Sequence, residues 1–312
     1  MSETMLERAP KAGKAASAAG RPNLFRLFRL RRAKRVNHSW WGNAIAFLVL
    51  CAVAAFMALP LVFSINNAFK PLDEIFVFPP RFLVRNPTLT NFGDLFSLLS
   101  NSWVPFSRYV FNTVFITLAG TVGHVILASA AAFVLAKYQF KGKNLIFTMI
   151  VLSLMFSGQV TMIPNYMTMA WLGWIDSYAS IIVPAFAYPL GLYLMKQFME
   201  MIPDSLLEAA KIDGASDYRI FWQIVMPLVK PAWMTLTILL FQMLWGTDGG
   251  NFVYSEQLKT LHYAVTQIVL GGIARTGAAA AVSLLLMSVP ILFFLFSQSK
   301  IIQTMATSGM KD

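Results

Sequence analysis

The chain has 312 residues, of which 57% are hydrophobic and only 12% are charged. A soluble domain averages nearer a quarter charged, so this composition excludes an ordinary soluble domain and is typical of membrane proteins. The net charge is +11, but the basic residues crowd at the N-terminus and at the ends of apolar segments, which argues against nucleic-acid binding. Cys51 is the only cysteine, so an intrachain disulfide and a multi-cysteine metal site are both excluded.

Six apolar stretches predict membrane spans, and none of them contains Asp, Glu, Lys or Arg. A helix needs about 20 apolar residues to cross the hydrocarbon layer, and an unpaired charge there costs about 2.5 kcal/mol or more. The stretches are Trp41–Ile65, Tyr109–Ala136, Asn144–Thr168, Tyr178–Met195, Pro231–Trp245 and Gly277–Ser297. The fifth is the shortest, and we expect it to extend into Gly246–Gly250. The predicted fold is an all-α membrane protein with six transmembrane helices.

The Lys and Arg residues of the connecting segments are distributed unequally across the predicted membrane. Nineteen lie in the N-terminal arm, the second and fourth connections and the tail, whereas six lie in the other connections. Because positive charge marks the cytoplasmic side, we expect both termini in the cytoplasm. The predicted domains are a basic N-terminal arm at residues 1–40, a transmembrane domain at residues 41–300 with a cytoplasmic loop at residues 200–230, and a cytoplasmic tail at residues 301–312.

The N-terminal arm and the first span leave two alternatives open. Leu24–Arg32 has the pattern of a short interfacial helix, or it serves only as a basic anchor. Ala52-Val53-Ala54 resembles a signal-peptide cleavage site, but the apolar run continues to Ile65, longer than a signal core of about 7–15 residues. We therefore expect the first span to remain in the protein.

The fourth connection, Lys196–Lys230, has a helical pattern of its own. Ser205 followed three residues later by Glu208 predicts a capping box at the start of a helix. One face of this helix carries apolar residues at helical spacing: Leu206, Ala209 and Ala210. The loop is thus expected to hold a short helix outside the bilayer.

A tight bend and a second short helix are expected to follow. Gly214 suits the left-handed position at which helices commonly end. Ser216 can cap a second helix, Asp217–Val225, which is expected to stop before Pro227. Two short helices joined by a bend would then lie on the cytoplasmic side.

The same loop carries a motif at specific spacing: Glu208-Ala209-Ala210, Asp213-Gly214-Ala215, Phe221, Ile224 and Pro227. This pattern resembles the "EAA" loop of ABC importer permeases, with Met226 where that family usually has Leu. The wider resemblance covers about the last two-thirds of the chain and is closest to the second permease subunit of maltose-type carbohydrate importers. It implies the fold of a type I ABC importer transmembrane domain.

In that family the loop sits in a groove of a cytoplasmic ATPase subunit and couples ATP hydrolysis to movement of the membrane helices. The resemblance therefore implies a coupling role for Glu208, Ala209, Ala210, Asp213, Gly214, Ala215, Phe221, Ile224 and Pro227. Glu208 and Asp213 would face basic or backbone groups of the ATPase, and the small residues would permit a close fit. The alternative is that Glu208 only caps the first helix and Gly214 only ends it.

The C-terminal residues Met305–Lys311 also resemble the tail of the maltose-type subfamily. The resemblance implies that the tail inserts between the ATPase subunits, with contacts from Ser308, Gly309, Met310 and Lys311. The alternative is a frayed terminus that makes no such contact.

Polar residues inside predicted spans are the candidates for a substrate pathway. These are Asn112, Gln159, Asn165 and Gln242. Their amides suit hydrogen bonding to sugar hydroxyls, but amide side chains in membrane helices also pack helix against helix. His124, in the second span, is expected to form such a helix-interface hydrogen bond.

Sequence motifs for catalysis, nucleotide binding and metal binding are missing. Gly142-Lys143 lacks both the upstream glycine and the hydroxyl of a phosphate-binding loop. The three histidines are scattered along the chain, so we expect neither a metal site nor a catalytic site. The resemblance implies no cofactor in this chain, with ATP and Mg bound by partner ATPase subunits.

The expected function is that of a permease subunit that imports a carbohydrate, in particular an oligosaccharide, across a bacterial cell membrane by alternating access. The implied partners are a second permease subunit in a heterodimer, two cytoplasmic ATPase subunits and an extracytoplasmic solute-binding protein. The loop does not exclude a polyol, an amino acid or a peptide as the solute. A secondary transporter driven by an ion gradient is the other alternative, but His124 is the only clear protonatable residue within a span.

Overall fold

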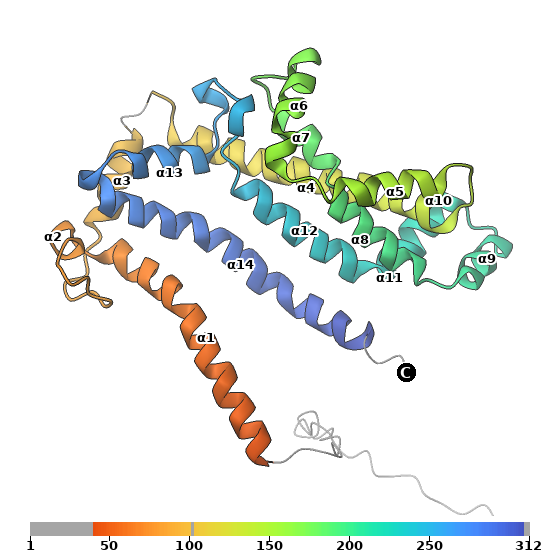
Figure 1. Cartoon of the computed structure of the whole chain (residues 1–312), viewed down its shortest axis with the longest axis horizontal. Helices are drawn as coiled ribbons and strands as arrows, with labels where there is room; N and C mark the ends of the chain where they lie inside the picture. Colours follow the sequence, from red (N-terminus) through yellow and green to blue (C-terminus); the bar gives the residue numbers. More distant parts are fainter. Residues whose placement is uncertain (1–39, 101–102, 309–312) are drawn as a thin grey trace, which may run out of the picture. The chain divides into compact units, whose positions relative to one another are not determined.

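The computed structural model describes residues 40–100 and 103–308, coloured along the chain in Figure 1. Most of the basic arm, with the interfacial helix predicted at Leu24–Arg32, lies outside the described residues, as do Gly309, Met310 and Lys311. The described residues form helices and no strand, which confirms the predicted all-α fold.

The helices differ widely in length, and several short turns of π- or 3₁₀-helix connect them. In chain order they are α1 (Trp40–Phe69), α2 (Leu72–Ile75), α3 (Thr90–Ser100), α4 (Phe106–Lys137), α5 (Lys143–Ser153), α6 (Gly158–Trp171), α7 (Ala179–Phe186), α8 (Pro189–Glu200), α9 (Asp204–Ile212), α10 (Asp217–Arg219), the π-helix η2 (Ile220–Val225), α11 (Met226–Leu228), α12 (Lys230–Trp245), η3 (Gly250–Phe252), η4 (Glu256–Leu258), α13 (Leu261–Leu270), η5 (Ile273–Arg275) and α14 (Thr276–Ser308).

The chain divides into two compact units, residues 1–56 and 57–312. In the first unit the described residues belong to α1, and its large apolar side chains are exposed, for example Phe47 and Leu50. An exposed apolar helix surface is suited to contact with lipid tails or with another chain.

The described residues contain four helical segments that are long and apolar enough to cross a membrane, or six when each of two bent pairs is one span. The four are Trp41–Phe69, Phe106–Lys137, Ala179–Glu200 and Thr276–Gln298. The bent pairs are Lys143–Ser153 with Gly158–Trp171, at 113°, and Asp217–Leu228 with Lys230–Trp245, at 77°. Each of the six predicted stretches coincides with one of these segments, except that the fourth begins one residue earlier, at Tyr178, and the third includes the break between Ser153 and Gly158.

Three of the predicted spans are less regular than expected. The third is broken before Gly158. Ser157 there has an extended backbone and occupies the N-cap position of α6, but its side chain makes no capping hydrogen bond. The fourth is broken between α7 and α8, because Pro189 has no N–H with which to continue the helix. The fifth ends at Trp245, and its expected extension to Gly250 is wrong, since Gly249 and Gly250 adopt positive φ.

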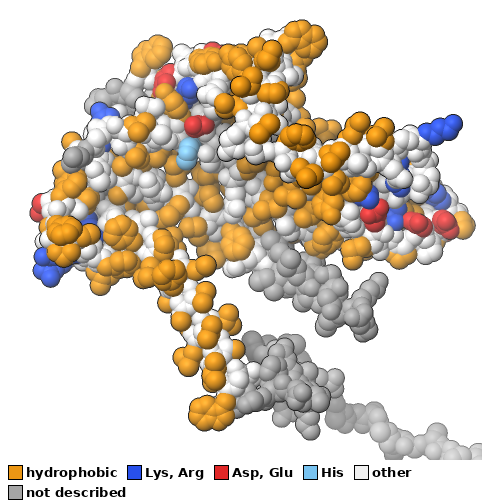
Figure 2. Space-filling model, in the orientation of Figure 1, with side chains coloured by type: hydrophobic (Ala, Val, Ile, Leu, Met, Phe, Trp, Pro, Cys, Tyr) orange, Lys and Arg blue, Asp and Glu red, His pale blue; other side chains and the backbone are white. Residues whose placement is uncertain are grey.

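Helix α4 is the centre of the second unit, where it packs against α7, α8, α12 and α13. At its C-terminal end it shares an apolar core with α8, the segment from α9 to α11 and the start of α12. A second core joins its N-terminal end to α3, α13 and α14. Figure 2 shows hydrophobic side chains over most of the face, with charged ones gathered at the right over α9 and α10 and along the left and upper-left margins.

The last part of the chain contains two helical features that the sequence analysis did not predict. Helix α13, Leu261–Leu270, lies in a stretch expected to be a loop, and it buries Leu261, Val265 and Ile268 in the second core. Helix α14 continues to Ser308, past the predicted end of the span at Ser297. No Pro or Gly interrupts residues 298–308, so the helix runs on into the predicted tail.

Candidate functional site

The first helix of the loop, α9, begins two residues earlier than predicted, with its N-cap at position 203 in place of 205. Its N-cap is Pro203, and no side chain caps it, so the predicted capping box of Ser205 and Glu208 is wrong. Asp204 instead occupies the first turn, where a carboxylate is favoured by the helix dipole. Glu208 is exposed and does not cap α9, so the alternative in which it serves only as a cap does not hold.

The bend and the second helix follow the sequence pattern in part. Gly214 has a φ of +80°, as predicted for the residue that ends α9. The Ser216 hydroxyl caps the second helix by accepting a hydrogen bond from the Arg219 amide at 3.4 Å. The helix does not stop before Pro227, which was expected to end it, because the backbone widens to a π-helix at Ile220–Val225 and Pro227 enters the first turn of α11.

An apolar core attaches this loop, residues 200–230, to the transmembrane helices. Leu207, Phe221 and Val225 are buried in it, beside Met195 and Met199 of α8. The Phe221 ring lies 5.4 Å from that of Phe133 on α4. The buried residues of α9 are Leu207 and, in part, Ala210, whereas Leu206 and Ala209 of the face noted in the sequence are exposed.

Another part of the loop surface exposes large apolar side chains that the described part of the chain leaves uncovered. Leu206 is 42% exposed, Ile212 86% and Tyr218 75%. Ala209 and Asp213 are also exposed, and the backbone at Gly214 leaves open space where a side chain would stand. Among the residues predicted for coupling, Phe221 is buried and Ile224 is partly buried in the core. The motif thus has a buried part that holds the loop and an exposed part that is free to contact a partner.

Charged contacts join the loop to the end of α4. The Lys137 Nζ donates to the Ile202 carbonyl at 2.5 Å and to Asp204 Oδ1 at 2.7 Å, and the Lys137 side chain is only 6% exposed. Lys211 pairs with Asp217 at 3.1 Å across the bend, and both side chains are about half exposed. The hydrogen bond from Lys211 lowers the pKa of the Asp217 carboxyl, and Asp217 in turn raises the pKa of Lys211.

The four polar residues predicted for a substrate pathway do not come together. Asn112 is fully buried, donates to the carbonyls of Gln257 and Lys259 and accepts from the Tyr178 hydroxyl at 2.7 Å. Its amide is used to join α4 to two other segments, which favours the packing alternative. Gln159 and Asn165 are exposed on α6.

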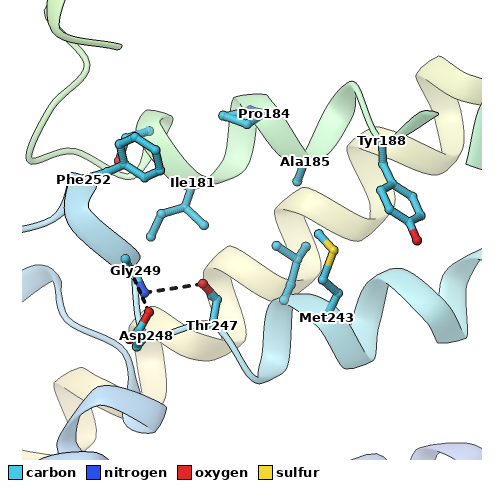
Figure 3. A pocket seen from close by; sticks show the side chains of 12 residues that line it. Ile181, Pro184, Ala185, Tyr188, Met243, Thr247, Asp248, Gly249 and Phe252 are labelled. Atoms are coloured by element: carbon cyan, nitrogen blue, oxygen red, sulfur yellow. Dashed lines mark hydrogen bonds between the residues drawn. The ribbon is translucent and has the colours of Figure 1, made fainter. Parts of the chain in front are cut away.

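Gln242 lines a cavity of about 560 Å³ between α12, α13 and α14, together with Trp245, His262 and Pro290. This cavity is separate from the one shown in Figure 3. His124 is buried, and its Nδ1 lies 2.8 Å from the Phe186 carbonyl, which is the predicted helix-interface hydrogen bond. Among the residues that the structure describes, no group of three His, Cys, Asp or Glu is placed to hold a metal ion.

A cavity of about 300 Å³ lies between α7 and the end of α12. Figure 3 shows the side chains that line it. Ile181 and Ala185 of α7 face Met243 of α12 and the turn that follows it. In this turn Gly249 donates to the Thr247 hydroxyl and Gly250 donates to Asp248 Oδ1 at 2.8 Å. Aromatic rings stand at the two ends of the cavity, Phe252 at one and Tyr188 at the other.

Residues 124–306, more than half of the chain, match the family described as "Binding-protein-dependent transport system inner membrane component". The chain belongs to this family. The match includes the loop at residues 200–230 and both walls of the cavity in Figure 3. The chain is therefore a transport permease of the membrane, as the loop motif predicted.

Two similar permeases have names that state different transported solutes. The chain is 26% identical over 283 residues to "Arabinooligosaccharides transport system permease protein AraQ" of Halalkalibacterium halodurans, covering 87% of this chain and 96% of AraQ. It is 33% identical over 203 residues to "sn-glycerol-3-phosphate transport system permease protein UgpE" of Yersinia enterocolitica, covering 63% of this chain and 72% of UgpE.

The permease fold is also found in a solved structure. A chain of a bacterial ABC transporter "involved in the import of the acidic polysaccharide alginate" superposes with a TM-score of 0.70 at 21% identity. The superposition covers 85% of this chain and 99% of the other. It confirms the predicted type I ABC importer fold.

Some functional features had no clear signal in the sequence. Lys137 and Leu207, which attach the loop to α4 and the core, were not among the predicted site residues. A buried lysine is recognised only when its partners are known, since sequence alone places it at the charged end of a span. The turn at Asp248-Gly249-Gly250 is visible in the sequence, but its place beside α7 is not.

Proposed function

We propose that this chain is the permease subunit of an ATP-driven importer, and that it moves a neutral oligosaccharide across the cell membrane by alternating access. The observation that carries the proposal is the loop at residues 200–230, which is anchored in the core on one face and exposes Leu206, Ile212 and Tyr218 on the other. We call it the coupling loop from here on. An uncovered apolar surface of this kind marks a protein contact.

The partner for this surface is a cytoplasmic ATPase subunit. Ala209 is small and Gly214 carries no side chain, so a second protein can approach the backbone closely, and the exposed Glu208 and Asp213 add negative charge at the rim. ATP and Mg would be bound by two such subunits, and this chain would carry out no covalent chemistry. A second permease subunit and an extracytoplasmic binding protein complete the proposed assembly.

The cavity in Figure 3 suits a neutral sugar better than an anion. Among the described residues that line it, none is Lys or Arg, and Asp248 contributes a negative charge. A phosphorylated polyol would need a cationic partner there. Tyr188 and Phe252 offer flat rings, and Ser180 and Thr247 offer hydroxyls. These features favour the solute class in the name of AraQ over that in the name of UgpE.

The C-terminal tail is proposed as a second contact with the ATPase subunits. Helix α14 continues to Ser308, eleven residues past the predicted end of the span at Ser297, so the start of the predicted tail is helical. Deleting residues 307–312 should then lower ATP hydrolysis by the assembled complex while leaving the amount of complex unchanged. Unaltered hydrolysis would show that the tail is dispensable.

The proposed function is tested by uptake into proteoliposomes that contain the chain, its second permease, the ATPase and the binding protein. We expect uptake of a labelled arabino-oligosaccharide that requires ATP, and no uptake of labelled sn-glycerol 3-phosphate. Preference for glycerol phosphate would overturn the substrate class. Uptake by this chain alone without ATP would overturn the importer mechanism in favour of a secondary transporter.

A further inference from the structure

The fourth span is interrupted at a defined place in the second unit. Helix α7 ends at Phe186 and α8 begins at Pro189, with Tyr188 in an extended conformation between them. In a continuous helix the Phe186 carbonyl would accept from the amide four residues later. The interruption removes that partner, and the carbonyl instead faces His124 Nδ1 of α4 at 2.8 Å.

The hydrogen bond to the Phe186 carbonyl sets the protonation of the His124 ring. His124 is fully buried in the middle of α4, and since its Nδ1 faces a carbonyl oxygen, the Nδ1 must carry the proton and donate. The Nε2 has no hydrogen-bond partner among the described residues. The centroid of the Tyr188 ring lies 5.8 Å from that of the imidazole, and the two ring planes are 68° apart. His124 therefore contacts Phe186 before the interruption and Tyr188 within it.

Two glycines allow α4 to approach the interruption this closely. A methyl group on Gly191, in the first turn of α8, would collide with His124 Nε2 and would lie 2.5 Å from Leu236 Cδ1. A methyl group on Gly123 would collide with the Phe186 ring. The ends of α7 and α8 are therefore both fixed against the same turn of α4.

The two halves of the fourth span lead to the two candidate sites. Helix α7 lines the cavity in Figure 3 through Ser180, Ile181 and Ala185. Helix α8 ends at Glu200, and α9 of the coupling loop begins only four residues later, at Asp204. Any movement of the coupling loop that shifts α8 thus reaches the cavity wall through the interruption that His124 contacts.

We propose that His124 is a positioning residue for import, which holds the Phe186 carbonyl and so fixes the angle between α7 and α8. With the hydrogen bond in place, displacement of α8 by the coupling loop displaces α7 as well. Without it, the interruption bends and the cavity wall stays where it is. This inference rests on the proposed ATP-driven function, which it deepens.

The test uses the assembled complex in lipid nanodiscs with a thiol reporter on α7. Cys51→Ser removes the native thiol, and Ile181→Cys places a thiol at a buried position of α7 that lines the cavity and offers no polar group to the sugar. A membrane-impermeant maleimide measures its accessibility without nucleotide and with Mg-ATP plus vanadate. Phosphate release with Mg-ATP alone measures ATPase activity in the same preparation.

In the reporter chain we expect nucleotide to raise the labelling rate by about 10-fold, within the usual range for coupled sites. His124→Leu should reduce that increase to about 2-fold or less while phosphate release persists, because only the transmission through the interruption is lost. His124→Asn should retain most of the increase, because its amide places an N–H donor near the position of Nδ1. Purely structural damage would instead lower assembly and phosphate release together.

A pair of variants keeps the test decisive if His124→Leu fails to assemble. Gly191→Ala should abolish the nucleotide response, because its methyl group displaces the imidazole from the Phe186 carbonyl. In the His124→Asn background the same substitution should be tolerated better, because the shorter amide removes the collision at Nε2 and leaves only the contact with Leu236 Cδ1, the end of a flexible side chain that can shift. Restoration of the response in the double variant is the expected result.

Three outcomes separate the two proposals. A full nucleotide response in His124→Leu, or an equal loss in Gly191→Ala with and without His124→Asn, would overturn the role of His124. Absence of any nucleotide response or of ATPase binding in the reporter chain itself would overturn the ATP-driven function. This last result is obtained with His124 unaltered, so it tests the ATP-driven function and not the role of His124.

Discussion

Two loops of the second unit are held by different forces. The coupling loop, residues 200–230, is fixed by buried apolar side chains of Leu207, Phe221 and Val225. The loop at residues 246–260, which the charge asymmetry predicts on the outer side and which we call the outer loop, is held by hydrogen bonds to several segments, three of them to one carboxylate. Asp176 accepts from the amides of Tyr254 and Ser255 at 2.9 and 2.8 Å and from the Ser255 hydroxyl.

The difference matters because the two kinds of attachment respond differently to perturbation. Apolar packing is distributed over many contacts and does not depend on pH, so the coupling loop can move as one body with α8. The outer loop depends on the charge state of Asp176, whose backbone has a positive φ of +57°. Loss of that single carboxylate removes three hydrogen bonds from the segment at Tyr254 and Ser255, while the bonds from Asn112 to the loop remain.

The largest expected effect concerns the sides of the membrane on which the two loops lie. Asn251→Cys and Ile212→Cys, each in a Cys51→Ser background, place thiols on exposed positions of the outer and coupling loops. On intact cells an impermeant maleimide should label only the variant at position 251, and the variant at 212 should label after permeabilisation. The reverse pattern would invert the topology that the charge asymmetry predicts.

The next effect comes from the bend in the coupling loop. Gly214→Val should lower ATP-driven uptake by about 100-fold or more, because a β-branched residue is strained by about 1–3 kcal/mol at a φ of +80°. The amount of protein in the membrane should be unchanged, as judged by immunoblotting. Gly142→Val is the matched control, since it has a φ of +92° and equally open space but lies outside the coupling loop. Equal loss of uptake in both variants would refute a specific role of the loop.

A smaller effect is expected from the charged contact between α4 and the coupling loop. Lys137→Met removes the donor to the Ile202 carbonyl and to Asp204, which should destabilise the start of α9 by about 1–3 kcal/mol. Amide hydrogen exchange at Leu207 should then become about 10-fold faster or more. Lys211→Met, which breaks a half-exposed pair, should leave that rate unchanged. Equal exchange rates in the two variants would contradict the importance of the buried lysine.

The smallest effect is the pH dependence of the outer loop. The hydrogen bond from the Ser255 hydroxyl, followed by those from the amides, lowers the pKa of Asp176 below its usual value. The stabilisation is therefore complete above the ordinary carboxyl pKa of about 3.9 and is lost as the pH falls through the lowered pKa. Amide exchange at Tyr254 and Ser255, corrected for its intrinsic pH dependence, should show no transition between pH 5 and pH 8.

Asp176→Asn should accelerate the exchange of both amides at every pH in that range. The coupling-loop amide of Leu207 provides the internal control, since its environment is apolar and should not respond. A transition between pH 5 and pH 8, or an unchanged rate in Asp176→Asn, would show that the carboxylate is not what holds the outer loop.

The sequence by itself determined the class of this protein, because hydropathy and charge asymmetry are local properties that survive without tertiary contacts. Six apolar stretches without charged residues predict the spans, and Gly214 and Ser216 predict the bend and the cap of the second loop helix. The motif from Glu208 to Pro227 is sufficient to indicate the permease family. Each of these signals depends on a few neighbouring residues.

The tertiary structure alone decided which residues meet. Hydropathy cannot report that α7 and α8 are separate helices facing His124, that α13 packs into a core, or that Leu207 rather than Leu206 is the buried residue of α9. Those outcomes depend on contacts between segments far apart in the chain, such as Lys137 with Ile202 and Asn112 with Lys259. Burial of polar groups is favourable only when partners are present, and the partners are supplied by folding.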